Sequence, residues 1–277
     1  MSRNLVEILG IKFDNLTEEE AVSRLSELLD RKGHALVTTP NPEFIITSQK
    51  DDSFRQILNE RSKLNLSDGI GLLWAARFLS LWQPGNKYLA VPIILIQWLF
   101  TLIFLPFIPR YFQRPLRSRV PGSDFIWNIA KLAAEKKQKL FLLGGAATVA
   151  ERAALRLQTD IVDLRIAGVH SGTPDQTPQI IEAVNKSRAD ILLVCFGAPK
   201  QEKWLDENLA KTCCKVGIGL GGTFDFIAGE RRRSPLWMQR SGLEWLYRLI
   251  VEPRRLRRQL VLPVFIWQVL IERFKKI

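Results

Sequence analysis

Asp68 is the acidic residue whose place in the chain is best suited to chemistry. It follows an apolar stretch at residues 64–66, typical of a short buried strand, and precedes an apolar segment from Ile70 onward, typical of a helix. A carboxylate in such a turn lies at the carboxyl end of a strand, where α/β proteins bind ligands. There it can act as a general base toward a bound hydroxyl group. The alternative is a structural role, in which Asp68 caps the helix that follows.

Two further polar residues follow another predicted strand, at residues 35–38. Thr39 and Asn41 alternate with two prolines, which hold the backbone extended and turn small polar side chains away from the core. Thr39 and Asn41 are therefore expected to lie at the end of one strand as Asp68 lies at the end of another. The alternative is an ordinary strand-to-helix loop in which Asn41 caps the helix at residues 43–49.

Glycine-rich turns follow three more predicted strands. Gly144 and Gly145 precede a predicted helix, and such a turn lets backbone N–H groups approach a phosphate. In the turn at residues 197–202, Lys200 is placed to meet a phosphate and Gln201 a nucleotide base or a sugar hydroxyl. A third loop, residues 217–225, is rich enough in glycine for close approach to a ligand. Ordinary strand-to-helix turns remain the alternative for the first two loops.

The C-terminal segment carries arginines at a spacing suited to a diphosphate. Arg248, Arg255 and Arg258 are separated by seven and three residues, which places them on one helical side if Pro253 starts a helix in line with the preceding one. Guanidinium groups bind phosphate oxygens in pairs. A solvated basic helix, or simple attraction to lipid headgroups, is the alternative.

The net charge of +12 is unevenly distributed over the 277 residues. Residues 231–277 carry a net charge of +9 and residues 82–119 a net charge of +5, so the remainder is slightly acidic. Both basic segments are strongly apolar, and five of the eight tryptophans lie in or beside them. This pattern favours an anionic membrane surface as the partner and argues against nucleic acid.

Residues 89–109 contain only two polar side chains, Gln97 and Thr101. The length suffices to cross a bilayer, but a single crossing would divide the predicted sheet between two sides of the membrane. Three prolines interrupt the run, which favours a re-entrant or interfacial helical insertion with both ends on the cytoplasmic face. A buried hairpin is the alternative.

The remaining chain alternates predicted strands and helices. This rhythm predicts an α/β, Rossmann-like body at residues 1–230 with a mostly parallel sheet and helices on both faces. Residues 82–114 form its membrane-associating insertion, and residues 231–277 form a basic helical appendage. Three cysteines without ligand spacing, and an N-terminus without an apolar leader, favour a reduced interior with no metal site. Neither His34 nor His170 is paired in the sequence with a nucleophile, so a hydrolase triad is unsupported.

Five motifs occur in the order that is found in a known family. They are the segments at residues 39–43, 67–71, 119–124, 197–202 and 243–248. In this order they resemble the WecG/TagA/CpsF family of bacterial glycosyltransferases (glycosyltransferase family 26). The resemblance covers essentially the whole chain apart from residues 82–114, and the apolar insertion departs from the soluble-body pattern of that family.

The resemblance implies an inverting, metal-independent enzyme that needs no cofactor. Its donor would be a UDP-sugar carrying an N-acetylhexosamine, N-acetylmannosamine in the best-known members, and its acceptor a sugar on a polyprenyl pyrophosphate. The position of the family's proposed base is Asp68, that of its polar pocket pair is Thr39 and Asn41, and the tail arginines match Arg248, Arg255 and Arg258. The oligomeric state is left open.

A second class of protein shares many of these features. A non-catalytic, membrane-bound protein that binds a nucleotide or a lipid phosphate would need the glycine turns and the arginines, and Asp68 would then be only a helix cap. A Rossmann dehydrogenase is a more distant alternative.

Overall fold

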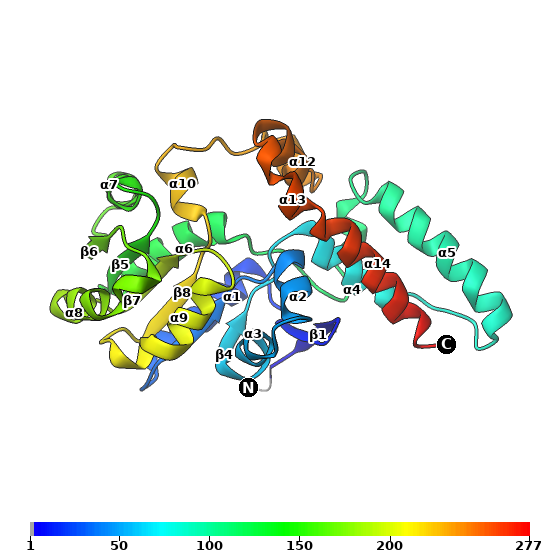
Figure 1. Ribbon diagram of the computed structural model, residues 1–277, viewed down its shortest axis with the longest axis horizontal. Helices are drawn as coiled ribbons and strands as arrows, with labels where there is room; N and C mark the ends of the chain where they lie inside the picture. The colour runs from blue at the N-terminus through cyan, green and yellow to red at the C-terminus, as the bar shows by residue number, and fades with distance from the viewer. Residues whose placement is uncertain (1–2) are drawn as a thin grey trace.

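A computed structural model describes residues 3–277, apart from the side chain of Arg257 (Figure 1). Its centre is a six-stranded, wholly parallel sheet in the order β4-β3-β8-β7-β5-β6. The strands of this sheet are β3 (Ala35–Thr38), β4 (Ser62–Asn65), β5 (Lys139–Gly144), β6 (Arg165–His170), β7 (Ile191–Cys195) and β8 (Val216–Gly219). The predicted α/β, Rossmann-like class is confirmed.

Helices cover both faces of the sheet because its strands are apolar on both sides. Along β5, for example, Leu140 and Leu142 point into one buried cluster, and Phe141 and Leu143 point into another. The first cluster is closed by α1 (Glu18–Asp30), α6 (Gly122–Glu135), α7 (Val149–Asp160) and α10 (Thr223–Ile227). The second is closed by α8 (Thr177–Ser187) and α9 (Lys200–Asn208). Continuous apolar strands are the expected pattern for a sheet buried on both faces.

Helix α1 begins as its sequence predicts. The Thr17 hydroxyl accepts a hydrogen bond from the Glu20 backbone N–H, and the Glu20 carboxylate accepts one from the Thr17 N–H, which completes a capping box. Ala21, Leu25 and Leu28 on its inner face are buried.

The N-terminal segment lies outside the main sheet. It forms an antiparallel hairpin of β1 (Leu5–Ile8) and β2 (Ile11–Asp14), separate from the main sheet. Leu9 and Gly10 both have positive φ angles, 50° and 76°, which is the backbone of the tight turn that joins twisted strands. A non-glycine residue in the first turn position hid this signal.

A third buried cluster lies beside the sheet and joins segments far apart in the chain. The hairpin packs there with helices from the middle and the end of the sequence, and Phe44, Trp74 and Phe265 are among its buried side chains. Trp74 lies 6.4 Å from Phe265 in an edge-to-face arrangement. The helices of this cluster are α2 (Pro42–Ser48), α3 (Asp52–Gln56), α4 (Ile70–Ser80), α5 (Lys87–Phe104) and α14 (Val261–Phe274).

Helix α5 is the apolar insertion, and it is long and apolar enough to cross a membrane. It runs alongside α14 at the outer side of the molecule (Figure 1). Ala90, Ile94 and Thr101 on one face are buried, and Thr101 accepts a hydrogen bond of 3.0 Å from the Trp74 indole N–H. Pro92 lies inside the helix, so this proline does not interrupt it as expected. The opposite face is exposed, and it includes Leu89, Ile96, Leu99, Phe100 and Ile103.

The C-terminal segment folds as a series of short helices before α14. They are α11 (Leu236–Arg240), α12 (Glu244–Val251) and α13 (Leu256–Gln259), with a 3₁₀ turn at Pro253–Arg255. Helix α14 then packs on α2 and α4, and buries Phe265, Val269 and Leu270. The division of the chain at residues 230 and 231 stays a prediction.

Arg273 fastens the end of α14 to the body. Its side chain is 4% exposed, and its guanidinium donates hydrogen bonds to the backbone carbonyls of Leu79, at 2.9 Å, and of Leu81. These carbonyls lie at the C-terminal end of α4, where helix carbonyls lack partners within the helix.

We predict that Arg273→Ala lowers the free energy of unfolding by about 1–3 kcal/mol, because it leaves these carbonyls without their charged donor. Urea denaturation measures the change. Lys275→Ala is the matched control, since the Lys275 side chain is 68% exposed and a change within about 0.5 kcal/mol is expected there. Equal stability of the two variants would show that Arg273 does not anchor α14.

Candidate active site

The candidate site lies at the carboxyl edge of the sheet, where β3 and β4 end side by side. The backbone N–H of Asp68 donates a hydrogen bond of 2.9 Å to the carbonyl of Pro40, so the turns after the two strands are directly joined. On the other side, the Val120 N–H donates to the Ser67 carbonyl at 2.7 Å. Asp68 is thus held between two ordered segments, at the edge where parallel α/β sheets bind ligands.

Asp68 does not cap the helix that follows it. The cap position of α4 is Gly69, with a φ of 112°, and no side chain accepts a capping hydrogen bond there. Burial raises the pKa of Asp68 from its ordinary value of 3.8 to about 6. The interpretation of Asp68 as a helix cap is therefore wrong, and its carboxylate titrates near neutral pH.

Charges of both signs act on Asp68 from three other parts of the chain. Arg248 and Arg119 lower its pKa, while Glu244 and Asp124 raise it, and burial outweighs their sum. Arg248 belongs to α12, so the C-terminal segment reaches the edge of the sheet in this structure. A half-buried carboxylate whose pKa is shifted by burial and by nearby charges is a candidate functional group.

Thr39 and Asn41 lie at the same edge, but part of their hydrogen-bonding capacity is already used. The hydroxyl of Thr39, a buried residue, donates to the Gly219 carbonyl at 3.2 Å and so joins the ends of β3 and β8. The Asn41 side-chain oxygen accepts from the N–H groups of Glu43, at 2.9 Å, and Phe44, at 3.2 Å. Asn41 is therefore the cap of α2, and its amide NH₂ is the group left to face a ligand.

Gln201 lies beneath the edge rather than on it. It is 1% exposed, and its side-chain oxygen accepts from the N–H groups of Gly197, at 3.1 Å, and Gly221, at 3.0 Å. Its amide NH₂ donates to Glu202 at 2.7 Å. Gln201 therefore ties two glycine turns together, whereas its neighbour Lys200 is exposed at the start of α9. A direct contact of either residue with substrate stays a prediction.

Gly144 and Gly145 lie farther along the edge. Four strand spacings separate the end of β5 from the end of β4, which is about 19 Å. Gly144 has a φ of 97°, and a Cβ there would lie 2.8 Å from the Cys195 carbonyl oxygen. Packing against β7 thus already requires glycine at residue 144. Any ligand contact by these two residues is with a part of the substrate distant from Asp68.

The three arginines of the tail do not lie along one continuous helix. Glu252, with φ −125° and ψ 76°, ends α12, and a 3₁₀ turn precedes α13. Each arginine instead has its own carboxylate. Arg248 bonds Glu244 at 2.7 Å, Arg255 bonds Glu252 at 2.8 Å, and Arg258 bonds both oxygens of Glu43 at 3.0 and 2.8 Å.

These pairings still bring the arginines toward the site. Glu43 is two residues beyond Asn41, so the Arg258 pair fastens α13 to the loop that holds Asn41. Arg248 also lies 4.7 Å from the ring of Phe226 in α10, in a cation–π contact. Arg248 and Arg231 both lower the pKa of Arg255, after burial as the main cause, which places three guanidinium groups near one another.

The charged partners of these residues were not predicted from the sequence. Asp124, bonded to Arg233, and Glu244 act on Asp68, and Glu43 holds Arg258. The four-residue spacing of Glu244 and Arg248 was a usable signal, because such pairs face each other on a helix. The Asp124–Arg233 and Glu43–Arg258 pairs join residues more than 100 positions apart, so no local pattern reveals them.

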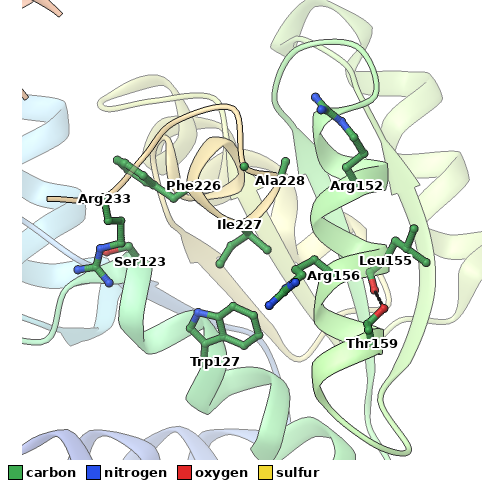
Figure 2. Close-up of a pocket in the computed structure, with 11 residues that line it drawn as sticks. Ser123, Trp127, Arg152, Leu155, Arg156, Thr159, Phe226, Ile227, Ala228 and Arg233 are labelled. Atoms are coloured by element: carbon green, nitrogen blue, oxygen red, sulfur yellow. Dashed lines mark hydrogen bonds between the residues drawn. The ribbon is translucent and has the colours of Figure 1, made fainter. Parts of the chain in front are cut away.

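A cavity of about 600 Å³ adjoins the site between α6, α7 and α10 (Figure 2). Trp127 and Phe226 supply aromatic walls, and Arg152, Arg156 and Arg233 supply charge. Each of these arginines already has a carboxylate partner, Glu230, Asp160 and Asp124 respectively. The cavity meets the Asp68 region through Arg233, whose pKa Asp68 helps to raise.

Within residues 3–277, no group of three or more His, Cys, Asp and Glu side chains is arranged to hold a metal ion. Metal independence of the reaction stays a prediction, and a chelator addresses it.

An α/β fold with a carboxylate of raised pKa at the strand ends and guanidinium groups near it is suited to an enzyme that acts on a phosphate-bearing substrate. The comparisons with known proteins agree. The sequence model of the Glycosyl transferase WecG/TagA/CpsF family matches residues 6–92 and 103–277. The chain therefore belongs to this family and is a glycosyltransferase, as its motifs predicted. The match leaves out residues 93–102, within α5.

Curated relatives carry the same name. The chain is 29% identical over 248 residues, 90% of its length and 84% of the relative's, to N-acetylglucosaminyldiphosphoundecaprenol N-acetyl-beta-D-mannosaminyltransferase of Bacillus subtilis. It is 24% identical over 266 residues, 95% of its length and 91% of the relative's, to the enzyme of that name in Staphylococcus aureus strain MRSA252. The enzyme from strain COL shows the same identity and coverage.

We predict that Gln201→Leu destabilises the fold by about 1–3 kcal/mol, because two half-buried backbone N–H groups lose their acceptor. Hydrogen exchange of the Gly197 and Gly221 amides should accelerate together. Glu207→Ala, an exposed change on the same helix, is the control and should leave both amides unaffected. Unchanged exchange in Gln201→Leu would show that the two turns do not depend on this side chain.

Proposed function

We propose that the protein transfers N-acetylmannosamine from a UDP-sugar to N-acetylglucosaminyl-diphosphoundecaprenol, with inversion at the anomeric carbon and without a metal ion. The names of its relatives support the sugar and the acceptor. The observation that carries the proposal is the position of Asp68, at the strand ends with a pKa of about 6 and under the influence of Arg248. Synthesis of a cell-envelope polysaccharide is the process in which such a product would be used.

In this mechanism Asp68 accepts the proton of the attacking acceptor hydroxyl. The hydroxyl oxygen forms a bond to the anomeric carbon while the bond from that carbon to the UDP oxygen breaks, so the proton goes to Asp68 and the electron pair leaves with UDP. A base works best when its pKa lies near the operating pH. The partial burial of Asp68 supports that role.

The arginines of the tail supply the positive charge for the diphosphates. In the structure Arg248, Arg255 and Arg258 each hold a carboxylate. A carboxylate and a phosphate oxygen accept the same hydrogen bonds, so substrate can replace these partners. Charge held in a site with little water stabilises the departing UDP more strongly than charge in water.

The protein acts at the cytoplasmic face of the membrane and is attached there through α5 and the C-terminal helices. One face of α5 packs on the body and the other is exposed and apolar, which supports a helix lying in the interface rather than crossing the bilayer. Exposed Trp237, Trp245 and Trp267 on the C-terminal helices support the same orientation.

We expect Asp68→Asn to lower turnover by about 10²–10⁴-fold, the usual contribution of a general base. Release of UDP in the presence of acceptor measures the rate, with and without chelator. In the wild type, turnover should rise with pH up to about 6, the pKa of Asp68, and then level off. Asp52→Asn, an exposed carboxylate on α3, is the control. Wild-type turnover in Asp68→Asn would remove Asp68 as the base.

The same substitution should stabilise the fold at high pH. The pKa of Asp68 is higher in the folded protein than in the unfolded chain, so the wild type loses stability as the pH rises from about 4 to 6. At pH 8 we expect Asp68→Asn to be more stable by up to about 3 kcal/mol, from 1.36 kcal/mol per pKa unit. Below pH 4 the difference should vanish, and thermal unfolding at both pH values measures it.

For the tail, Arg255→Ala should lower turnover at least about tenfold, because a charge-assisted hydrogen bond contributes roughly 1.5–3 kcal/mol. Binding to vesicles should change far less. Arg254→Ala is the matched control, since Arg254 is exposed in the same turn. A parallel fall of turnover and vesicle binding in Arg255→Ala would show that the tail serves only to attach the protein to the membrane.

A further inference from the structure

A second cavity, of about 760 Å³, lies beyond the end of α5 and shares no residue with the Asp68 site. It is formed by the segment that follows α5, by the start of α1 and by α4. Four of its seven lining residues are arginines, and none is acidic. The lining residues are Thr17, Arg77, Arg110, Tyr111, Gln113, Arg114 and Arg117.

Most of this positive charge has no protein partner. Arg117 donates to both oxygens of Glu20 at 2.7 Å. Within residues 3–277, no carboxylate lies within salt-bridge distance of Arg77, Arg110 or Arg114. The Arg77 guanidinium lies 4.4 Å from the centre of the Tyr111 ring, and its Nε is buried without a hydrogen-bond partner. In the first cavity, by contrast, every arginine is paired with a carboxylate. Guanidinium groups without a carboxylate partner favour the binding of an anion.

The cavity opens beside the apolar surface of the insertion. Arg110 and Tyr111 belong to the 3₁₀ turn Pro109–Phe112, which comes directly after α5. Phe107 and Ile108, just before this turn, are 74% and 40% exposed. An anion attached to an acyl chain can therefore place its charge in the cavity and its chain along the exposed face of α5.

We propose that this cavity binds the phosphate of an anionic phospholipid headgroup and so fixes α5 in the plane of the bilayer. The inference builds on the proposed membrane attachment. The acceptor diphosphate is the other lipid-borne phosphate, but it must lie beside Asp68. The cavity lies away from Asp68, because Arg77 is seven residues along α4 from Ile70, about 10 Å from the start of that helix.

The test measures binding of the full chain to vesicles of phosphatidylcholine alone and to vesicles containing phosphatidylglycerol. Arg110→Ala/Arg114→Ala should lose about ten- to thirtyfold in binding to the anionic vesicles, at roughly 1 kcal/mol per charge near the surface. Arg110→Lys/Arg114→Lys should retain most of the binding. Lys131→Ala/Lys186→Ala removes the same charge from exposed positions on α6 and α8 and should bind as the wild type does.

Turnover on a short-chain acceptor in detergent separates the two lipid phosphates. The proposal requires wild-type turnover and KM in Arg110→Ala/Arg114→Ala. A tenfold rise in KM for that acceptor would assign the cavity to the acceptor diphosphate and overturn the proposal. Undiminished binding of this variant to anionic vesicles would overturn it as well. A complete lack of turnover in the wild type would contradict the proposed function, and the vesicle comparison would still decide the role of the cavity.

Discussion

The site depends on how much water and how much opposing charge surround one carboxylate. Burial favours the neutral acid of Asp68, and Arg248 and Arg119 favour the carboxylate, while Glu244 and Asp124 oppose them. The sum leaves the pKa near 6, where a group can both lose and accept a proton at physiological pH. Because Arg248 comes from α12, this balance exists only while the C-terminal segment is docked.

Docking of that segment rests on ordinary core packing. Helix α14 buries Phe265, Val269 and Leu270 in the third cluster, and Arg273 binds carbonyl groups at the end of α4. Between this anchor and the sheet edge, the arginines of the short helices form ion pairs with carboxylates. These pairs allow several positive charges to lie near one another when no anion is bound. The tail is thus held at one end by apolar contacts and at the other by exchangeable ionic ones.

Helix α5 has a different relation to the body. Both of its faces are apolar, but only one has a protein partner in the described part of the chain. Such a helix is stable against α4 and α14 and still has a surface that water solvates poorly. With the unpaired arginines at its end, it joins an apolar and a cationic surface on the side of the molecule away from the sheet.

The sequence by itself determined the parallel sheet, the capping box of α1, the turn of Asp68 and the family, because periodicity, turn residues and motif order are local properties. The prediction of Asn41 and Gln201 as ligand-binding residues was incomplete, because most of their polar atoms make hydrogen bonds within the protein. Only the tertiary structure decided that Glu43 partners Arg258, how far Gly144 lies from Asp68, and the pKa of Asp68. These depend on burial and on contacts between residues distant in the chain, which no local pattern encodes.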